Sequence, residues 1–318
     1  MTRRSGRKSG RSATATSESA GNGLYKNLAN QLDKVFREAT RRNEKRVSVQ
    51  TLHRYRDSVS KFLGFCAERF RLQKMAKVTD KHLRAYVEWR RENGIAEKTI
   101  KEDLAAVRFF HRYTGSERRL APNEAFGLRP TPQGGVDRAW TEGEFEKMTA
   151  LAERLGREDV AAAMGLARHS GLRIHECVRL NRADAEEALR TGVLTVKGKG
   201  GRIREIPLRP RAKEILRAAC DRASERRKLF VSEGEKAHVV IKRIQAFIER
   251  HRETVTEKER EVNLTFHGLR HLYAREEYQE RVRPVHGRRA RRDAALRVAE
   301  LLGHGRAEVT QIYIGKEE

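Results

Sequence analysis

The stretch VLTVKGKGGRIREI, residues 193–206, is the only clear β signal in this chain. Two segments with strand-like patterns, Val193-Leu194-Thr195-Val196 and Ile203-Arg204-Glu205-Ile206, flank the turn Gly198-Lys199-Gly200-Gly201, which predicts a β-hairpin. Helical patterns precede and follow it. The sequence therefore predicts a mainly α-helical fold with a small antiparallel β-sheet, an α+β domain built around this hairpin.

The domain that contains the hairpin is expected to start at Thr141. Thr141-Glu142-Gly143-Glu144 is a capping box, with Thr at the N-cap and Glu three residues later. The helices expected in this domain lie near 142–155, 157–170, 173–180, 210–227, 236–252, 267–282 and 292–302, with a short one from Thr310 to Tyr313.

A separate helical bundle is expected from Leu24 to about Gly115. Apolar residues recur there at helical spacing in four segments, with Lys and Arg on the outer faces. Thr79 is the predicted N-cap of the third helix, and Asn93-Gly94 is its predicted end.

Two segments lie outside these patterns. Residues 1–22 hold five Lys or Arg and no large apolar side chain, so we expect a disordered basic arm that either tracks phosphates or is only a flexible leader. Residues 116–138 are rich in Pro and Gly, which indicates an interdomain linker. The expected domains are therefore 23–115 and 139–318.

The charge of the chain indicates a polyanionic partner. Lys and Arg number 69 against 44 Asp and Glu, a formal net charge of +25 over 318 residues. Nucleic acid is the expected partner because each neutralised phosphate releases counterions. The alternatives are a ribosome-associated protein and a soluble protein from an Arg-rich proteome.

The cysteines and the apolar runs exclude several other classes. Cys66, Cys177 and Cys220 are scattered, which argues against a disulfide framework and a thiolate zinc site and fits a reducing cytoplasm. The N-terminus has no apolar signal-peptide core, and no stretch approaches the roughly 20 apolar residues of a membrane span. We expect a soluble, intracellular protein with no membrane partner.

Five local patterns carry residues suited to chemistry, and each has an ordinary alternative. Arg173 and Glu176 are three apart and could simply be a surface ion pair. Lys199 could be an exposed turn lysine. The spacing of His267 and His271 would suit zinc, but an Arg lies beside them and no thiolate is near, so no metal is expected. A tyrosine such as Tyr313 is usually structural.

Taken together, the order Arg173, Lys199, His267-x-x-Arg270, His304, Tyr313 supplies what phosphodiester transfer needs without a metal: a nucleophile, charge neutralisation and a proton for the leaving oxygen. Here the sequence closely resembles the catalytic domain of tyrosine recombinases, the phage integrases. The matching stretches are SGLRIHECVRL, VKGKGGRIREIPL, FHGLRHLYA and LLGHGRAEVTQIY. The upstream bundle resembles the core-binding domain of that family.

The resemblance implies a role for each of these residues. Arg173 and Arg270 would clamp the scissile phosphate, and His304 would hydrogen-bond to it. Lys199 would be the general acid for the 5′ oxygen, and His267 would accept or relay the proton of Tyr313. Tyr313 would attack and form a 3′-phosphotyrosyl bond. Glu176 would have a supporting role, by positioning either Arg173 or the neighbouring histidine. No cofactor would be needed.

DNA contacts beyond the catalytic set are expected from basic side chains of both domains. The basic segment 281–292 is longer than the family suggests, and is either a DNA-facing loop with six arginines or a disordered insertion. The chain ends five residues after Tyr313, which puts tail exchange between subunits in doubt. The candidate DNA-binding residues are Arg54, Lys61, Lys98, Lys101, Arg108, Arg288 and Arg289.

The resemblance implies a two-domain clamp around double-stranded DNA and site-specific recombination of a mobile element through a Holliday junction. The protein would form a homo-tetramer on DNA, or be a monomer in solution, with accessory DNA-bending or directionality proteins. It would be cytoplasmic and nucleoid-associated in a prokaryotic host. The alternatives are a type IB topoisomerase-like nicking and rejoining enzyme and a non-catalytic DNA-binding protein of the same fold.

Overall fold

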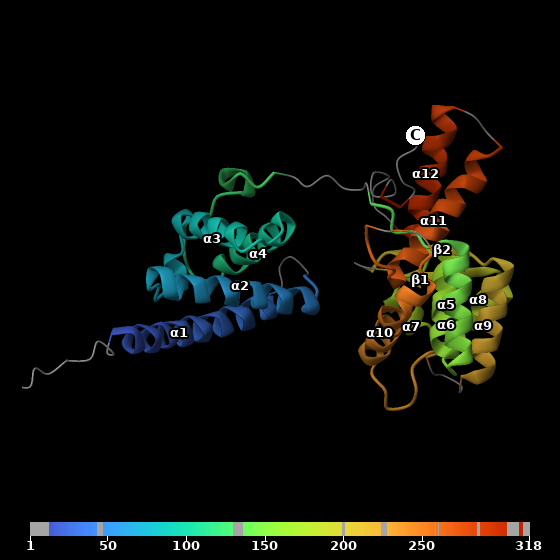
Figure 1. Ribbon diagram of the computed structural model, residues 1–318, viewed down its shortest axis with the longest axis horizontal. Helices are drawn as coiled ribbons and strands as arrows, with labels where there is room; N and C mark the ends of the chain where they lie inside the picture. The colour runs from blue at the N-terminus through green and yellow to red at the C-terminus, as the bar shows by residue number, and fades with distance from the viewer. Residues whose placement is uncertain are drawn as a thin grey trace, which may run out of the picture. The chain divides into compact units, whose positions relative to one another are not determined.

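The computed structural model describes residues 13–42, 47–129, 136–198, 201–223, 228–257, 259, 261–284, 287–303 and 312–313. The chain divides into two compact units, Met1–Thr131 and Pro132–Glu318, and each has its own apolar core (Figure 1). The predicted fold class, mainly helical with a small antiparallel sheet, is confirmed. None of the described helices combines the length and the apolar character that crossing a bilayer requires.

The first unit is the predicted bundle of four α-helices. Its core contains large side chains such as Phe62, Tyr86 and Phe110, all fully buried. Thr79 is the N-cap of the third helix, which ends at Glu92 as predicted. The helices are α1 (Ala13–Arg42), α2 (Val49–Phe70), α3 (Asp80–Glu92) and α4 (Glu97–His111), and α1 lies along α2 (Figure 1).

The structure corrects both segments that were predicted to be irregular. Helix α1 begins at Ala13, inside the predicted disordered arm, because extending an existing helix adds one hydrogen bond for each residue that it orders. Residues 1–12 lie outside the described residues. Within the predicted linker 116–138, Phe126 and Leu128 are buried in the core of the first unit, since burial of apolar surface outweighs the turn-forming composition.

The second unit is organised around α6, an Ala-rich helix that is buried along most of its length. Small side chains let the neighbouring helices α5, α9 and α11 approach closely. At Gly165 an added Cβ would lie 2.5 Å from Ile215 of α9. The helices of this unit are α5 (Glu142–Arg154), α6 (Glu158–Ser170), α7 (Ile174–Arg179), α8 (Arg182–Thr191), α9 (Pro210–Arg222), α10 (Ala237–Val255), α11 (Phe266–Val282) and α12 (Arg288–Leu302).

The predicted hairpin is present as β1 (Val193–Lys197) and β2 (Ile203–Pro207), paired antiparallel with Val196 opposite Arg204. The strands alternate between buried and exposed positions, so one face packs on the core. This alternation places Arg204 on the buried face beside Ile206. Helix α8, which precedes the hairpin, was not predicted because it buries only two alanines and its apolar pattern is weak.

The basic segment 281–292 is largely helical, which corrects both readings of it as a loop or a disordered insertion. Helix α11 continues to Val282 and α12 already begins at Arg288. Arginine is a good helix former, so a run of arginines extends both helices. The side chain of Arg281 also forms an ion pair within α11, with Glu277 one turn earlier. Val285 and His286 lie outside the described residues.

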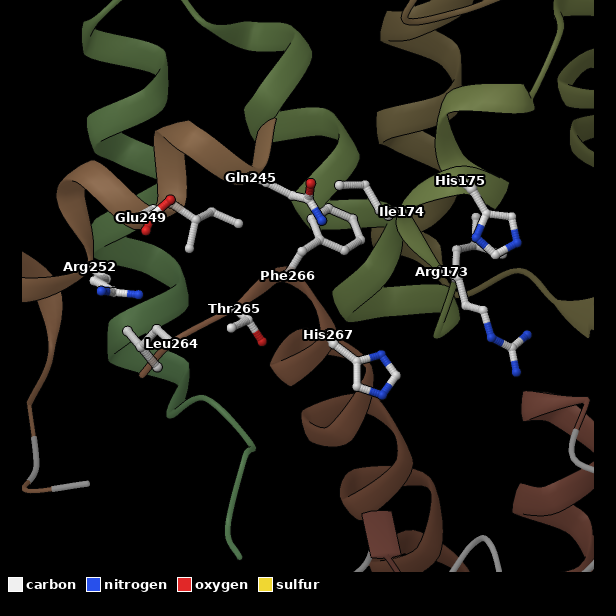
Figure 2. Close-up of a pocket in the computed structure, with 12 residues that line it drawn as sticks. Arg173, Ile174, His175, Gln245, Glu249, Arg252, Leu264, Thr265, Phe266 and His267 are labelled. Carbon is white, nitrogen blue, oxygen red and sulfur yellow. The ribbon is translucent and has the colours of Figure 1, made fainter. Parts of the chain in front are cut away.

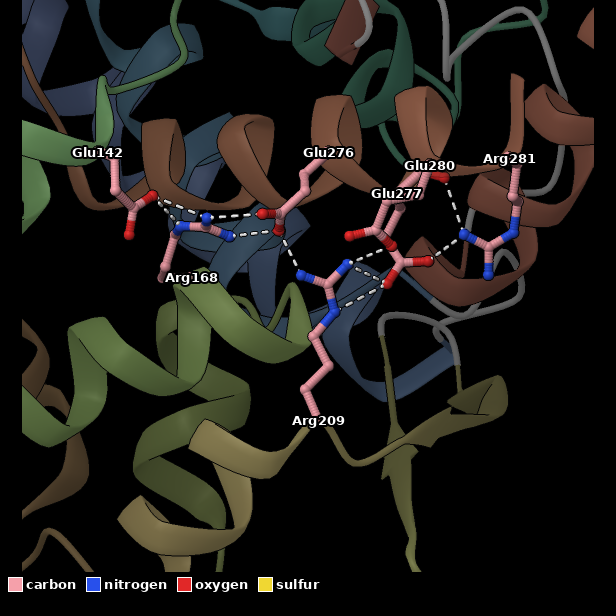
Figure 3. Close-up of polar contacts among 7 residues, drawn as sticks. All are labelled: Glu142, Arg168, Arg209, Glu276, Glu277, Glu280 and Arg281. Atoms are coloured by element: carbon pink, nitrogen blue, oxygen red, sulfur yellow. Dashed lines mark hydrogen bonds and ion pairs between the residues drawn. The ribbon is translucent and has the colours of Figure 1, made fainter. Parts of the chain in front are cut away.

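A ladder of ion pairs holds α11 against α6 and the start of α9. Figure 3 shows carboxylates of α11 alternating with two arginine side chains from the neighbouring elements. The hydrogen bonds of Arg168 lower the pKa of Glu276 to about 2, so this carboxylate is ionised at neutral pH. The ladder consists of Glu142, Arg168, Arg209, Glu276, Glu277, Glu280 and Arg281.

Removing the buried cation of this ladder should destabilise the second unit. The side chain of Arg168 is 6% exposed and pairs with Glu142 and Glu276, so Arg168→Met leaves two carboxylates short of a partner. We expect the free energy of unfolding to fall by about 1–3 kcal/mol, measured by urea denaturation, because both carboxylates are partly exposed and Glu276 keeps Arg209 as a partner. Arg211→Met, which removes an exposed pair with Glu214, is the control and should change it by about 0.5 kcal/mol or less. Equal losses for the two variants would contradict this assignment.

Candidate active site

The first turn of α11 presents two of the candidate catalytic residues, His267 and Arg270, on the same side of the helix. Close packing holds this turn in place. The indole Nε1 of Trp140 donates to the carbonyl of Thr265 at 2.9 Å. An added Cβ at Gly268 would lie 2.4 Å from the carbonyl oxygen of Arg138, so only glycine lets the chain approach this closely.

Tyr313 lies against this turn and contacts both histidines of the motif. Its hydroxyl is 3.1 Å from Nε2 of His267. Its ring stacks on His271, with 4.2 Å between centroids and 18° between planes. The guanidinium carbon of Arg270 is 5.8 Å from the ring centroid. His271 therefore orients the phenol through this stacking contact.

The electrostatic surroundings of His267 keep its imidazole neutral. Burial, reinforced by the positive charges of Arg270 and Arg173, lowers the pKa of His267 to about 4. A neutral imidazole has one ring nitrogen that accepts; in the tautomer protonated at Nδ1 this is Nε2, which faces the Tyr313 hydroxyl. His267 is thus in position to take the phenolic proton.

Arg270 is completely buried and is held by two backbone carbonyls. Nη1 donates to Gly171 and Nη2 donates to Leu302, at the ends of α6 and α12. Burial and the nearby charge of Arg173 lower the pKa of Arg270 to about 10, so it remains charged at neutral pH. These bonds fix the direction of its planar guanidinium.

Arg173 is the N-cap of α7 and is more open than Arg270. Its side chain is 23% exposed, and its Nη1 donates to Glu176 at 2.9 Å. Glu176 accepts from the Arg173 backbone N–H as well, at 2.8 Å. Burial would raise the pKa of Glu176, but the hydrogen bonds and charge of Arg204 lower it to about 2. Glu176 therefore supports Arg173 as an ionised carboxylate.

The structure brings together Arg173, Glu176, His267, Arg270 and Tyr313. The other two predicted residues, Lys199 and His304, lie outside the described residues. The residue before each of them is described: Gly198 follows β1, and Gly303 follows α12.

A cavity of about 500 Å³ opens beside Arg173 and His267. Figure 2 shows these two side chains toward one end of it, and Glu249 and Arg252 of α10 at the other. The α10 residues were not among the candidates, because nothing in their local sequence distinguishes them from an ordinary amphipathic helix. Within the described ranges no group of three or more His, Cys, Asp or Glu side chains could hold a metal ion.

The candidate DNA-binding residues differ in the exposure of their side chains and in the hydrogen bonds that these side chains form within the protein. Arg108 is half-buried and donates to the carbonyl of Ala121 at 2.7 Å and to Asn123 at 2.9 Å, so it holds the bundle together instead of lying on its outer face as expected. Lys101 donates to the carbonyl of Arg129 at 2.6 Å. The exposed members of the set are Arg54, Lys61, Lys98, Arg288 and Arg289.

Two family models match the chain. One, described as the phage integrase N-terminal SAM-like domain, matches residues 39–118, and the other, the phage integrase family, matches residues 139–318. A tyrosine recombinase XerC from Pseudomonas syringae pv. tomato is 31% identical over 284 residues, which are 86% of this chain and 87% of the relative. A tyrosine recombinase XerC from Pseudomonas fluorescens is 30% identical with the same coverage.

Solved structures share the fold at lower identity. A lambda integrase dimer bound to a COC′ core site superposes with a TM-score of 0.64 at 19% identity and covers 91% of this chain and 77% of that one. A XerH site-specific recombinase bound to its palindromic difH substrate gives a TM-score of 0.62 at 19% identity, with 91% and 82% covered.

The low pKa of His267 can be measured directly. We expect its imidazole to titrate near pH 4, below the ordinary value of 6.5, when followed by NMR of the ring nitrogens. The His267→Gln spectrum identifies the signal. Because the unfolded chain takes up this proton near pH 6.5, the folded protein should lose stability as the pH falls from 6.5 to 4. A midpoint near 6.5 would show that the imidazole is not held in a buried, cationic environment.

The matched family model covers more than half of the chain, and the relatives align along most of their own length. The geometry agrees with that match, since the tyrosine and two arginines of the shared motifs come from distant parts of the chain to one place. The chain belongs to the phage integrase family and is a tyrosine-type site-specific DNA recombinase.

Proposed function

We propose that this recombinase cuts and rejoins DNA through Tyr313 and the residues that surround it. The observation that carries the proposal is the 3.1 Å contact between the Tyr313 hydroxyl and Nε2 of a neutral His267, next to two arginines. The phenol oxygen attacks phosphorus, the bond from phosphorus to the 5′ oxygen breaks, and a 3′-phosphotyrosyl bond forms. His267 accepts the phenolic proton, and Lys199 donates a proton to the 5′ oxygen.

Arg173 and Arg270 stabilise the charge that develops on the non-bridging oxygens, and His304 adds a hydrogen bond. Arg270 is suited to this task because its guanidinium is fixed by two carbonyls before substrate arrives. Arg173 is partly exposed and can meet the DNA backbone. These groups supply the charge neutralisation that other phosphoryl transfer enzymes obtain from a divalent cation, so we expect cleavage to proceed in EDTA.

The wider proposal is paired strand exchange on double-stranded DNA by a homo-tetramer, through a Holliday junction, during integration or excision of a mobile element. Two structural neighbours support it by their own complexes: a lambda integrase tetramer bound to a Holliday junction, and the Tn1549 transposon integrase with circular intermediate DNA. Residues 23–115 would bind DNA and residues 139–318 would carry out catalysis. Accessory DNA-bending or directionality proteins would select the direction.

DNA outside the cleavage point would be contacted by exposed basic side chains of both units. In the first unit these are Arg54, Lys61 and Lys98, and in the second Arg288 and Arg289 at the start of α12. Each neutralised phosphate contributes to the salt dependence of binding, so removing one such cation should lower the slope of log K against log salt by about one.

The covalent intermediate gives the first test. Cells expressing the protein together with its native flanking DNA are lysed in detergent, protein–DNA adducts are precipitated, and the attached DNA ends are sequenced. We expect ends at one short sequence with the wild-type protein, and none with Tyr313→Phe, which still binds that DNA. An adduct that persists in Tyr313→Phe would refute Tyr313 as the nucleophile.

The pattern of ends separates the alternatives. Tyr313-dependent ends scattered over many sequences would favour a type IB topoisomerase-like enzyme. Failure of the wild-type protein to form any adduct would favour a DNA-binding protein that retains the fold. An adduct at one site, formed also in EDTA, supports recombination.

The acid role of Lys199 can be tested with a substrate whose 5′ bridging oxygen is replaced by sulfur. Sulfur leaves without protonation, so Lys199→Ala should slow cleavage of the oxygen substrate by about 10²–10⁴-fold and leave the sulfur substrate nearly unaffected. The rates are measured as single-turnover adduct formation on the mapped site. Equal slowing on both substrates would remove Lys199 from this role.

A further inference from the structure

Arg204 joins three segments that carry the proposed catalytic residues. It lies on the inner face of β2 and is 7% exposed. Nη1 and Nη2 donate to the two oxygens of Glu176 at 2.9 and 2.7 Å, and Glu176 in turn holds Arg173. Nε donates to the carbonyl of Leu301, in the last turn of α12, at 2.9 Å. All three contacts use different nitrogens of one rigid plane.

Two glycines pack directly on this side chain. A Cβ added at Gly198 would lie 3.3 Å from Nη1 of Arg204, and one added at Gly303 would lie 3.0 Å from its Cδ. Gly303 also has a φ of +64°, which disfavours other residues. Gly198 immediately precedes Lys199, and Gly303 immediately precedes His304. The chain therefore packs on Arg204 at two points, each one residue before a proposed catalytic group.

We propose that Arg204 is a positioning residue for the strand-cleavage reaction, which sets where the segment that carries Lys199 starts relative to Arg173. This inference rests on the proposed function of those residues. Arg204 acts through the segments it holds and does not itself reach the DNA, because its guanidinium is buried and its contacts are with Glu176 and Leu301.

The geometry of the guanidinium explains why arginine is needed at this position. A carboxylate and a carbonyl are bound at the same time by the two edges of one plane. A lysine ammonium keeps the charge that the buried Glu176 requires, but a point charge cannot hold both partners at fixed directions. Arg204→Lys is therefore the informative change, whereas Arg204→Met would leave Glu176 with Arg173 as its remaining charged partner and threaten folding.

A positioning role and a purely structural role predict different substrate dependence. If Arg204 positions Lys199, replacing Arg204 should slow cleavage most when the leaving atom is oxygen, because oxygen needs a proton from Lys199. If Arg204 only stabilises the fold, its loss slows cleavage to the same extent whichever atom leaves. A misplacement of a catalytic group by about 1 Å costs on the order of 100-fold in rate.

The test compares Arg204→Lys with wild type on the mapped half-site, carrying either oxygen or sulfur at the 5′ bridging position, at saturating protein. We expect single-turnover adduct formation to slow by about 100-fold on oxygen and by about threefold or less on sulfur. The matched control is Arg202→Lys, the same change at an exposed residue of the same hairpin, for which both rates should stay within about twofold of wild type. Equal slowing on both substrates, or no slowing, would overturn the proposal.

Amide hydrogen exchange of the DNA-free protein gives a second readout that does not need activity. The N–H of Gly198 donates to the carbonyl of Arg202 at 2.7 Å, which closes the base of the Lys199 loop. In Arg204→Lys this amide should exchange at least about tenfold faster, while those of the distant α5 are unchanged. Unchanged exchange at Gly198 would overturn the positioning role of Arg204, whether or not the wild-type protein forms an adduct. A missing adduct in the wild-type protein, by contrast, would count only against the proposed function.

If Arg204→Lys does not fold, Gly198→Ala replaces it. Its backbone angle permits alanine, and the added Cβ pushes on Nη1 of Arg204. The same preferential loss on the oxygen substrate is expected, and an equal loss on both substrates would again refute the positioning role.

Discussion

Two arginines share one buried carboxylate in the second unit and a third arginine lies nearby, and the active site depends on how these charges are balanced. Arg173 and Arg204 both hydrogen-bond to Glu176, while burial and the nearby charge of Arg173 lower the pKa of Arg270. Buried like charges repel one another strongly, so an ionised Glu176 is what allows these guanidinium groups to stay together without DNA. The cluster keeps an excess of positive charge, which a phosphodiester would neutralise.

The helix that presents His267 and Arg270 is held by ion pairs further along its length. Arg168 and Arg209 pair with acidic residues along α11, so the helix that carries His267 and Arg270 is fixed to α6 and to the start of α9 (Figure 3). Gly171 and Gly268 let α6 and α11 approach neighbouring backbone and aromatic groups closely. Electrostatic contacts and tight packing thus act together to hold the first turn of α11, and a preorganised site loses less energy to reorganisation during the reaction.

Neutral histidine and charged arginine coexist here because of the same burial. Desolvation lowers the pKa of His267 far enough to leave it neutral, yet Arg270 starts from so high a value that it stays protonated at neutral pH. One environment therefore provides a proton acceptor and a cation a few ångströms from the same phenol. The stacked His271, with a pKa lowered to about 3, adds no competing charge.

The sequence by itself determined most of the local elements and suggested the reacting groups that we propose. The hairpin, the capping boxes and the main helices follow from patterns within a few residues, and the spaced motifs named Arg173, His267, Arg270 and Tyr313 before any geometry was known. Local patterns failed where burial decided the outcome: Phe126 and Leu128 pack on the bundle in a segment that looked like linker, and Arg108 turns inward. Only the tertiary structure could show that Arg204 joins Glu176 to Leu301, and that His271 stacks on Tyr313. These contacts join residues up to 97 positions apart, so they depend on how helices and strands pack and not on the propensities of neighbouring residues.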